Sequence, residues 1–558
     1  MEISWLNWSD AAFKKAKKED KPILLDLTAC WCHWCHVMDE TSYKDAEVIK
    51  IIHEKFVPIR VDIDKHPVIR DRYNFGGFPT TAFLTPAGDI MGGGTYISPP
   101  VLRQYLLDIH QVFRKNKKEL LSKMKELKIM ASSQKEAPKG KLSHEIVEKA
   151  LEMVKSNFDS YNGGFGSAPK FPMSEVLDFL SLEYSISKEK GLLEMITKSL
   201  NGMKPLHDKI EGGFFRYSVS PDWSEPHYEK MLETNAGLLR NYLNGFLVSK
   251  DKSYKEMAKS VLGYVKQHLA DPAGGFYGSQ DANETYYRVL TSQRKKLPKP
   301  YIDKALYVSW NGGMVSSFLL ASRVLKTKSY ESYALKTLDR LWKLCWNEKK
   351  GLFHFWDGNP ASEGVFADHV HLGLAFLDAF EQVQDHSFLD KAEKLAIVMQ
   401  KYFLDKKTRS FNDSVPLKGA KGLLKIPAKN VVENALAAGF FWRLSFLADK
   451  PKYRSLAKQV LEAFVSSYEH NSLFVASYAA AVEQFLSGPI QVYIIGSLKD
   501  EKVQGLLSAA LARFGERNIV QVLDPRDKRW LPKHKFPKNK VTAYVCEGEL
   551  CKGPFFRL

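Results

Sequence analysis

The feature that most constrains the fold of this chain is a short apolar segment that runs directly into a Cys-x-x-Cys pair. Residues 23–35 read ILLDLTACWCHWC, which places Cys32 and Cys35 just after a run typical of a buried strand. A helix is predicted to follow, from Cys35 to Phe56. The N–H groups and the dipole at a helix N-terminus stabilise a thiolate. The segment therefore predicts an α/β domain that carries a redox dithiol.

Two other residues strengthen the redox interpretation. Asp26 lies in the predicted strand, six residues before Cys32. Burial of a lone carboxylate raises its pKa, so Asp26 can take the proton of the second thiol. Pro79 precedes a predicted strand at 80–85, where a cis-proline loop would face the dithiol and pair with an extended substrate. We therefore predict that Cys32, Cys35, Asp26 and Pro79 form a catalytic site.

Two other interpretations of the dithiol remain open. Cys30, Cys32, Cys35 and His36 contain the ligand types of a Cys3His zinc site. However, Cys-x-Cys is poor spacing for one tetrahedral site, and no second Cys or His knuckle lies nearby. The pair could also be an inert relic. The redox interpretation is favoured, so neither a metal nor a cofactor is expected.

The number of cysteines bears on the redox compartment. Six cysteines in 558 residues do not make a disulfide framework. The N-terminus has no basic segment followed by an apolar stretch, which predicts a cytoplasmic, reduced protein. Cys546 and Cys551 are accordingly expected to be reduced thiols. The alternative is that they serve as a redox partner of the dithiol. Cys345 is expected to lie in a core.

Charge and hydropathy exclude some classes of partner. No run of 18 apolar residues exists, so no membrane span is expected. The formal net charge is +17, and it is densest at 114–128, 294–304 and 526–540. These stretches are not interleaved with aromatic residues as a strand-binding groove would be. We therefore expect solvated lysine-rich faces, with neither nucleic acid nor membrane as a partner.

The pattern of elements predicts several domains. Strands at 22–28, 57–62 and 80–85, with helices at 10–18 and 99–113, predict an α/β domain over residues 1–113. Residues 114–142 are Lys-rich, with helical spacing at 120–129, and are predicted to be a linker. A small α/β appendage is expected over 490–558, with strand-like segments at 490–495, 519–523 and 543–546 and a helix near 500–513.

Residues 143–489 have helical periodicity only. Twelve helices are predicted, at about 143–158, 174–188, 190–207, 234–249, 253–269, 311–326, 329–346, 368–384, 388–403, 431–448, 451–469 and 473–487. Gly-aromatic turns recur between pairs, at Gly163-Gly-Phe165, Gly212-Gly-Phe214, Gly274-Gly-Phe276 and Gly351-Leu-Phe353, with a degenerate copy at Arg409-Ser-Phe411. Six hairpins with such turns predict an (α/α)6 toroid.

Polar residues gather in the long loops of this helical region. Sugar chemistry uses paired carboxylates or histidines beside aromatic platforms. The predicted sugar pocket comprises Arg216, Tyr217, His227, Glu229, Asp281, Trp310, Asn311, Asp368, His369 and His371. The structural alternative is that Asp368 caps a helix, that the histidines are satisfied core groups and that the Gly-Phe turns are packing devices.

Residues 1–112 resemble a thioredoxin-fold domain, with His33-Trp34 in place of the usual Gly-Pro. This resemblance implies that Cys32 is the attacking cysteine, Cys35 the resolving cysteine, Asp26 the buried acid and Pro79 the cis-proline. A histidine between the cysteines is expected to stabilise the Cys32 thiolate and to make the pair more oxidising.

Longer motifs extend the resemblance over nearly the whole chain. They are CHWCHVM at 32–38, GGTY at 93–96, GGFGSAPKFP at 163–172, GGFFRYSV at 212–219, PHYEKML at 226–232, WNG at 310–312 and YVC at 544–546. Together they resemble the spermatogenesis-associated protein 20 family, whose members join a thioredoxin-like domain to a six-hairpin glycosidase-like domain. The chain departs from the family at 280–283, which read QDAN instead of EDAD, and at His369, where a tyrosine is expected.

The sequence thus predicts a thiol–disulfide oxidoreductase domain fused to a carbohydrate-processing or carbohydrate-binding toroid. Its partners would be a protein disulfide or small thiol, and a sugar or glycan. One alternative is a glycan-binding or protein-binding module with a redox-sensing dithiol. Another is a sugar epimerase or glycosidase in which His227 pairs with His369 or His371 and the thioredoxin-like domain is a scaffold.

Overall fold

The computed structural model describes residues 2–115, 140–415, 419–512, 515, 517–527, 536–537 and 540–558. Contacts divide the chain into two compact units. The first comprises Met1–Glu136, Gln280–Asp303 and Asp413–Ala428, and the second comprises Ala137–Ser279, Lys304–Asn412 and Lys429–Leu558. Two internal segments of the helical region therefore group with the N-terminal domain. Most of the predicted linker, including its helical spacing at 120–129, lies outside the described residues.

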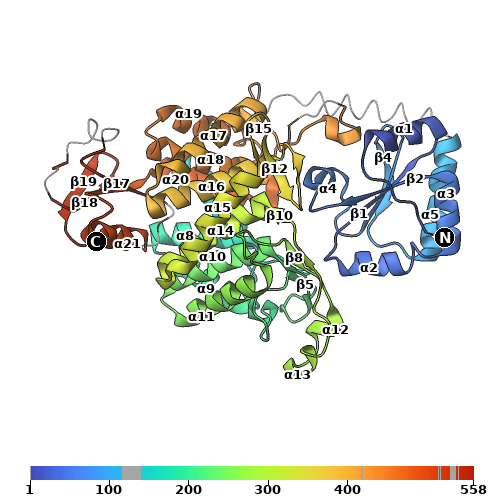
Figure 1. The fold of residues 1–558 in the computed structure, drawn as a ribbon, viewed down its shortest axis with the longest axis horizontal. Helices are drawn as coiled ribbons and strands as arrows, with labels where there is room; N and C mark the ends of the chain where they lie inside the picture. The colour runs from blue at the N-terminus through green and yellow to red at the C-terminus, as the bar shows by residue number, and fades with distance from the viewer. Residues whose placement is uncertain are drawn as a thin grey trace. The chain divides into compact units, whose positions relative to one another are not determined.

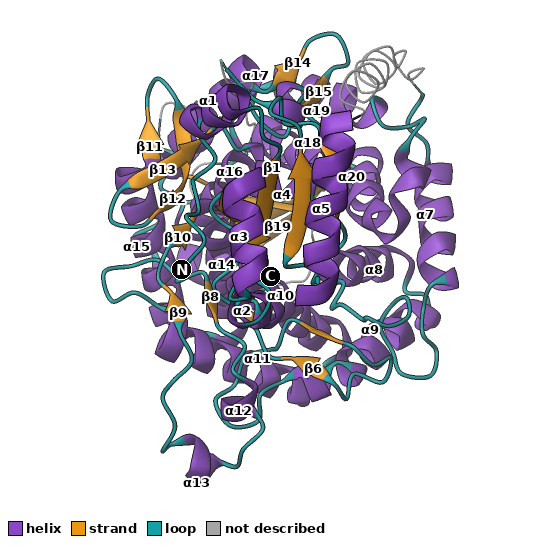
Figure 2. Ribbon diagram, turned by 90° about the vertical axis from the view of Figure 1, so that its right-hand side faces the viewer, coloured by secondary structure: helices purple, strands orange, loops and turns teal. Residues whose placement is uncertain are grey.

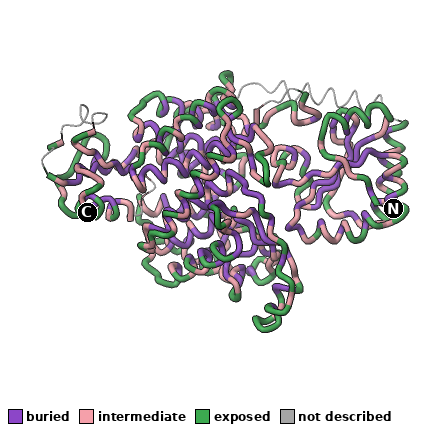
Figure 3. Tube along the Cα trace, viewed as in Figure 1, coloured by how far each residue is buried: buried purple, intermediate pink, exposed green. Residues whose placement is uncertain are grey.

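A four-stranded mixed sheet forms the centre of the first unit. Its strands are β1 (Ile23–Thr28), β2 (Val57–Asp62), β3 (Thr80–Leu84) and β4 (Ile90–Gly94), in the order β2-β1-β3-β4. β1 pairs parallel with β2 and antiparallel with β3, so the strand that leads to the dithiol is central and buried (Figures 1 and 3). β4 was not predicted, because its sequence, Ile-Met-Gly-Gly-Gly, is rich in a residue that strands disfavour.

Five helices accompany this sheet within residues 2–115. They are α1 (Asp10–Glu19), α2 (His33–Glu40), α3 (Ala46–Lys55), α4 (Pro67–Tyr73) and α5 (Pro99–Lys115). Figure 2 shows α3 and α5 side by side in front of the sheet, and Val48, Ile52 and Leu102 pack with Leu24 and Phe83 in one core. The single helix predicted from Cys35 to Phe56 is wrong. Two helices form instead, because Asp45 caps α3 by accepting hydrogen bonds from the N–H groups of residues 47 and 48.

Twelve long helices form a toroid in the described part of the second unit. The inner helices are α8 (Ser174–Ser187), α10 (Leu232–Ser249), α14 (Val308–Leu325), α16 (Phe366–Val383), α18 (Val431–Leu447) and α20 (Val475–Ser487). Each packs against the next, and α20 packs against α8, which closes the ring (Figure 1). The outer helices are α7 (His144–Ser156), α9 (Lys190–Gly202), α11 (Lys252–Tyr264), α15 (Lys328–Cys345), α17 (His386–Tyr402) and α19 (Pro451–Glu462). The predicted fold class is confirmed.

No helix among the described residues is both long and apolar enough to cross a bilayer.

One polar device repeats at the Gly-aromatic turns of this toroid. Asn235, Asn311 and Asn434 are each the fourth residue of an inner helix. Each side-chain amide accepts from the backbone N–H, and donates to the carbonyl, of the turn phenylalanine, at 2.7–3.1 Å. Each also donates to the carbonyl four residues earlier. This amide clamp satisfies buried backbone groups that the turn would otherwise leave unpaired.

Removing one clamp is expected to destabilise the toroid. Asn311→Ala leaves the N–H and carbonyl of Phe276 and the carbonyl of Tyr307 without these partners, at a cost of ~3 kcal/mol. For a domain of this size that cost lowers the thermal midpoint by about 4 °C. Circular dichroism at 222 nm measures the shift, with exposed Asn359→Ala as the control. Equal midpoints for the two variants would contradict the role given to the clamp.

The C-terminal segment of the second unit forms a second mixed sheet. It contains β16 (Ile490–Ile495), α21 (Glu501–Leu511), β17 (Asn518–Leu523), β18 (Thr542–Glu547) and β19 (Leu550–Phe555), in the strand order β17-β16-β18-β19. β19 was not predicted. The sheet is tied to α16 because Glu381 accepts a hydrogen bond from the backbone N–H of Val520 at 2.9 Å.

Candidate functional site

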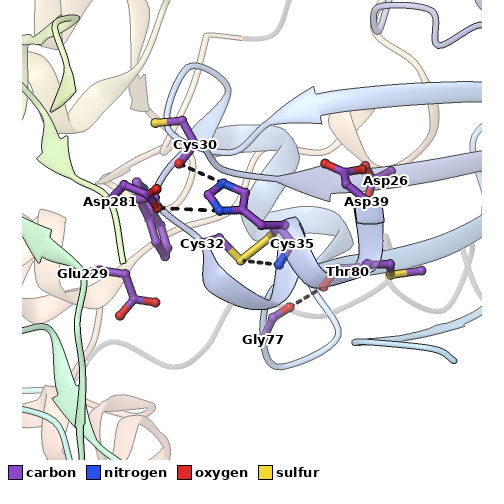
Figure 4. Close-up of a disulfide and its surroundings, with 12 residues drawn as sticks. Asp26, Cys30, Cys32, Cys35, Asp39, Gly77, Thr80, Glu229 and Asp281 are labelled. Atoms are coloured by element: carbon purple, nitrogen blue, oxygen red, sulfur yellow. Dashed lines mark hydrogen bonds and ion pairs between the residues drawn. A yellow bond between two sulfur atoms is a disulfide. The ribbon is translucent and has the colours of Figure 1, made fainter. Parts of the chain in front are cut away.

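The dithiol lies where β1 passes into α2. Cys32 is the N-cap of α2, and its sulfur accepts a hydrogen bond from the backbone N–H of Cys35 at 3.2 Å. The two cysteines are joined as a disulfide, and their exposed fractions are 3% and 2%. Figure 4 shows the pair with Asp26 and Asp39 on one side and Asp281 on the other. The predicted strand–dithiol–helix arrangement is therefore present, with the first sulfur at the helix N-terminus.

Asp26 is buried, as predicted, but it is not alone. It is 1% exposed and lies opposite Arg60 in the β1–β2 register. Arg60 donates from Nε to Asp26 at 2.6 Å and also pairs with Asp39, and the Tyr43 hydroxyl lies 3.4 Å from Asp26. Burial raises the pKa of Asp26 to about 6, against the pull of the Arg60 charge. Sequence reasoning missed Arg60, although an arginine inside the apolar run Val57–Asp62 indicates a buried partner.

The residues beside the dithiol are held by buried polar contacts. Trp31, which precedes Cys32, donates from its indole N–H to Asp64 at 2.6 Å. Burial, followed by the neighbouring Asp62 charge, raises the pKa of Asp64 to about 7. The Phe78–Pro79 peptide bond is cis, as the resemblance implied. The Thr80 hydroxyl that follows it donates to the carbonyl of Gly77 at 2.6 Å.

The segment 280–303 brings two carboxylates to the histidines of the dithiol helix. Asp281 Oδ1 lies 3.8 Å from His36 Nδ1, and Glu284 Oε1 lies 3.8 Å from His33 Nε2. The backbone N–H of Ala282 lies 3.4 Å from the carbonyl oxygen of Trp31. Asp281 was predicted in the sugar pocket. The structure places it beside the dithiol, and its segment groups with the N-terminal domain.

The residues of the alternative zinc set are engaged in other contacts. Cys32 and Cys35 are bonded to each other, and His36 Nε2 lies 3.1 Å from the backbone oxygen of Cys30. Within the described ranges, no group of three or more His, Cys, Asp or Glu side chains is arranged to hold a metal ion.

Four residues of the predicted sugar pocket lie together in the second unit: Arg216, Tyr217, His227 and Glu229. Tyr217 lies opposite His227 on two short strands, β5 (Tyr217–Ser218) and β6 (Pro226–His227), and their rings stack with centroids 4.6 Å apart. Phe171 stacks on the other face of Tyr217 at 4.6 Å, and the Arg216 guanidinium lies 5.7 Å from the same ring. The result is a three-ring platform with Phe171 exposed at one end.

Glu229 adds a buried carboxylate to this platform. Its Oε1 lies 3.1 Å from His227 Nδ1, while Oε2 has no hydrogen-bond partner among the described residues, and Glu229 is 2% exposed. Burial, followed by the Glu229 charge, raises the pKa of Tyr217 to about 12. We call Phe171, Tyr217, His227 and Glu229 the platform cluster. A carboxylate, an imidazole and aromatic faces are the groups that sugar sites use.

Trp310, Asp368 and His371 lie elsewhere in the ring. Asp368 is buried and accepts hydrogen bonds from the backbone N–H of Ser309 at 3.0 Å and from His354 Nδ1 at 2.9 Å. Trp310 packs against Tyr307 with centroids 4.6 Å apart. Burial lowers the pKa of His371 to about 4, so this imidazole is neutral near pH 7. His354 was missed, although it interrupts the apolar strand β12 (Gly351–Trp356).

Asn311 and His369 have structural contacts in place of the predicted pocket role. Asn311 is one of the amide clamps, and His369 is the fourth residue of α16, the equivalent position. His369 Nε2 accepts from the backbone N–H of Leu352 at 3.0 Å, and its Nδ1 lies 2.9 Å from the carbonyl oxygen of Val365. Burial lowers the pKa of His369, which keeps it neutral. His369 therefore performs at its turn the task that asparagine performs at three others.

Comparisons with known proteins match the two parts of this fold. The family model Thioredox_DsbH, described as "Protein of unknown function, DUF255", matches residues 1–131. Thioredoxin-1 of Drosophila melanogaster is 33% identical over 66 residues, which cover 12% of this chain and 59% of that protein. Spermatogenesis-associated protein 20 of Homo sapiens is 23% identical over 99% of this chain and 88% of that protein. The chain is similar to spermatogenesis-associated protein 20 over nearly its whole length.

The resemblance to the spermatogenesis-associated protein 20 family is thus confirmed from end to end. This chain itself joins a thioredoxin-like domain to a toroid of six helical hairpins. Among solved structures, cellobiose 2-epimerase from Bacillus thermoamylovorans matches with a TM-score of 0.48 and 12% identity, over 58% of this chain and 86% of that one.

Proposed function

We propose that the N-terminal domain is a thiol–disulfide oxidoreductase that acts on a protein disulfide or a small thiol. The observation that carries this proposal is the position of Cys32 and Cys35 at the N-terminus of α2, with the Cys32 sulfur accepting a backbone hydrogen bond. Such a site lowers the pKa of a thiol, and the thiolate is the reactive species in exchange. Asp26, buried on the adjoining strand, supports the same chemistry.

The reaction follows from these groups. In the reduced protein, the Cys32 thiolate attacks one sulfur of a substrate disulfide. That S–S bond breaks, and its electron pair leaves on the other substrate sulfur, which takes a proton. The Cys35 thiol gives its proton to Asp26 and attacks the Cys32 sulfur of the mixed disulfide. The bond between Cys32 and the substrate sulfur breaks, and that sulfur leaves with the electron pair and takes a proton. Cys32 and Cys35 are then joined as they are in Figure 4.

The pKa of Asp26 suits this proton transfer. A base is most effective when its pKa lies near the working pH, and burial brings Asp26 to about 6. Arg60 is 2.6 Å from Asp26 and also contacts Asp39, so the guanidinium remains paired when Asp26 takes the proton. Asp26 therefore cycles between its two protonation states without leaving an unpaired buried cation.

Reduction of insulin by dithiothreitol tests the proposal. The protein is expected to accelerate insulin precipitation over dithiothreitol alone, and Cys35→Ser is expected to accumulate a mixed disulfide through Cys32, visible by intact mass. The proposal is overturned if the protein does not accelerate insulin precipitation and Cys35→Ser forms no mixed disulfide. Reversible oxidation of the pair without any turnover would instead support the redox-sensing binding module.

A second candidate function belongs to the helical domain. We propose that the platform cluster binds or processes a carbohydrate. It is supported by the Phe171–Tyr217–His227 stack and by the buried Glu229 oxygen that lacks a partner. Sugar rings pack on aromatic faces through their C–H edges, and a carboxylate hydrogen-bonds to hydroxyls.

Truncating the platform is expected to weaken sugar binding. Tyr217→Ala removes the central ring of the stack, so affinity for a reducing mono- or disaccharide should fall about tenfold. Isothermal titration measures the change, with exposed Tyr161→Ala as the control. Turnover that His227→Ala abolishes and Cys32→Ser spares would favour the epimerase or glycosidase alternative. The proposed carbohydrate function is wrong if the unaltered protein shows no saturable binding to any reducing mono- or disaccharide tested.

A further inference from the structure

The C-terminal sheet contains a second cysteine pair outside the site described above. Cys546 and Cys551, expected from the sequence to be reduced thiols, are joined as a disulfide. They lie directly opposite each other in the β18–β19 register, with Cα atoms 4.0 Å apart. The strands are connected by the tight turn at Gly548 and Glu549, so the register alone brings the two sulfurs together.

The two cysteines differ in their surroundings. Cys546 is 3% exposed on β18, an interior strand of the sheet, and packs with Tyr493, Leu523 and Tyr544. Cys551 is exposed and lies on β19, which forms the edge of the sheet. A reagent in solution therefore reaches the sulfur of Cys551 first, whereas the sulfur of Cys546 faces a packed cluster.

The position of the bond is a poor one for a structural staple. Disulfides stabilise mainly by restricting the unfolded chain, and the effect shrinks as the enclosed loop shortens. Only four residues separate Cys546 from Cys551, and the β18–β19 hydrogen bonds already close this hairpin. Accessible disulfides of this kind are the labile ones in proteins.

We propose that Cys546 and Cys551 form a second redox site, which takes a dithiol as its reductant. A thiolate of that dithiol attacks the Cys551 sulfur. The Cys546–Cys551 bond breaks, and its electron pair and a proton go to the Cys546 sulfur. The second thiol of the reductant displaces Cys551 as a thiolate, which takes a proton, and the reductant becomes a disulfide. Two electrons and two protons pass to the hairpin.

The geometry also determines which reductants succeed. A monothiol stops at a mixed disulfide on Cys551, and β18 holds the Cys546 thiol directly opposite that sulfur. Attack by Cys546 then restores the hairpin bond and expels the monothiol, because the local concentration of the opposed thiol is high. A dithiol completes the reduction because its second thiol attacks the mixed disulfide within the same adduct.

Timed alkylation of the full chain tests the site independently of the proposed oxidoreductase. The protein used carries Cys32→Ser and Cys35→Ser, so the first dithiol is absent. It is treated with dithiothreitol or with glutathione at equal thiol concentration, alkylated without denaturant and read by peptide mass spectrometry. Cys345 reports unfolding, because burial keeps it inaccessible and raises the pKa of its thiol to about 12.

Dithiothreitol is expected to open the pair while Cys345 stays unlabelled, with Cys551 labelled about tenfold or more faster than Cys546. Glutathione is expected to leave both cysteines unlabelled, because Cys546 expels it and the hairpin bond re-forms. Cys551→Ser should leave Cys546 unreactive in the folded protein. The proposal is overturned if the pair resists dithiothreitol until Cys345 also reacts. It is equally overturned if the reduced pair does not re-form its bond with oxidised glutathione.

Discussion

Replacing Cys32 with serine is expected to lower the rate of disulfide reduction by at least ~10³-fold, to that of dithiothreitol alone. The hydroxyl of serine is not ionised at neutral pH, so the attack that starts the reaction is lost. The backbone N–H of Cys35, which donates to the Cys32 sulfur, can donate to the serine oxygen instead. Serine is an N-cap residue at least as good as cysteine. The loss is therefore one of chemistry and not of folding.

A neighbouring cysteine supplies the matched control. Cys30 is not part of a disulfide and lies two residues earlier in the same segment, and its serine variant should stay within about twofold of the unaltered protein. The insulin assay measures both variants under one set of conditions. Activity that survives in Cys32→Ser, or that disappears in Cys30→Ser, would move the reactive thiol away from the N-cap of α2.

Asp26→Asn is expected to stabilise the N-terminal domain above pH 6. The pKa of Asp26 is about 6 in the folded protein, against 3.8 when it is exposed on unfolding, so between these values the folded state binds more protons. Stability therefore falls as pH rises from about 4 to 6, and the full loss persists at higher pH. Moving a carboxyl pKa from 3.8 to about 6 corresponds to ~3 kcal/mol. Asparagine keeps an oxygen toward Arg60 without carrying the buried charge.

Urea unfolding at pH 4 and pH 8 measures this effect, with pulse proteolysis reporting peptides from β1 and β3. The two proteins should unfold at similar urea concentrations at pH 4, and the variant should be more resistant at pH 8. Exposed Asp108→Asn on α5 is the control and should follow the unaltered protein at both pH values. Asp64, whose raised pKa has the same sign, contributes equally to all three proteins. If the difference in urea midpoint between Asp26→Asn and the unaltered protein is the same at pH 4 and pH 8, the buried charge of Asp26 is not the cause.

Much of the fold follows from local patterns in the chain. The apolar run before Cys32 predicted β1, and the helix predicted at 10–18 is α1, which Ser9 caps by accepting from the N–H of Ala12. Apolar residues at helical spacing predicted all twelve helices of the toroid. Such features depend on neighbours within one or two turns, so the sequence contains what is needed to recognise them. The break between α2 and α3 was missed because apolar spacing continues across it.

What the sequence by itself determined about this protein is therefore the dithiol, the element that carries it and the helical hairpins. Only the tertiary structure decided which groups these residues contact. It paired Asp26 with Arg60, placed Asp281 beside His36 instead of in the ring, and made His369 the equivalent of a clamp asparagine. It also joined Cys546 to Cys551 across a hairpin. The reason is physical: the role of a buried polar side chain is set by its hydrogen-bond partners, and most of these come from segments far away in the chain.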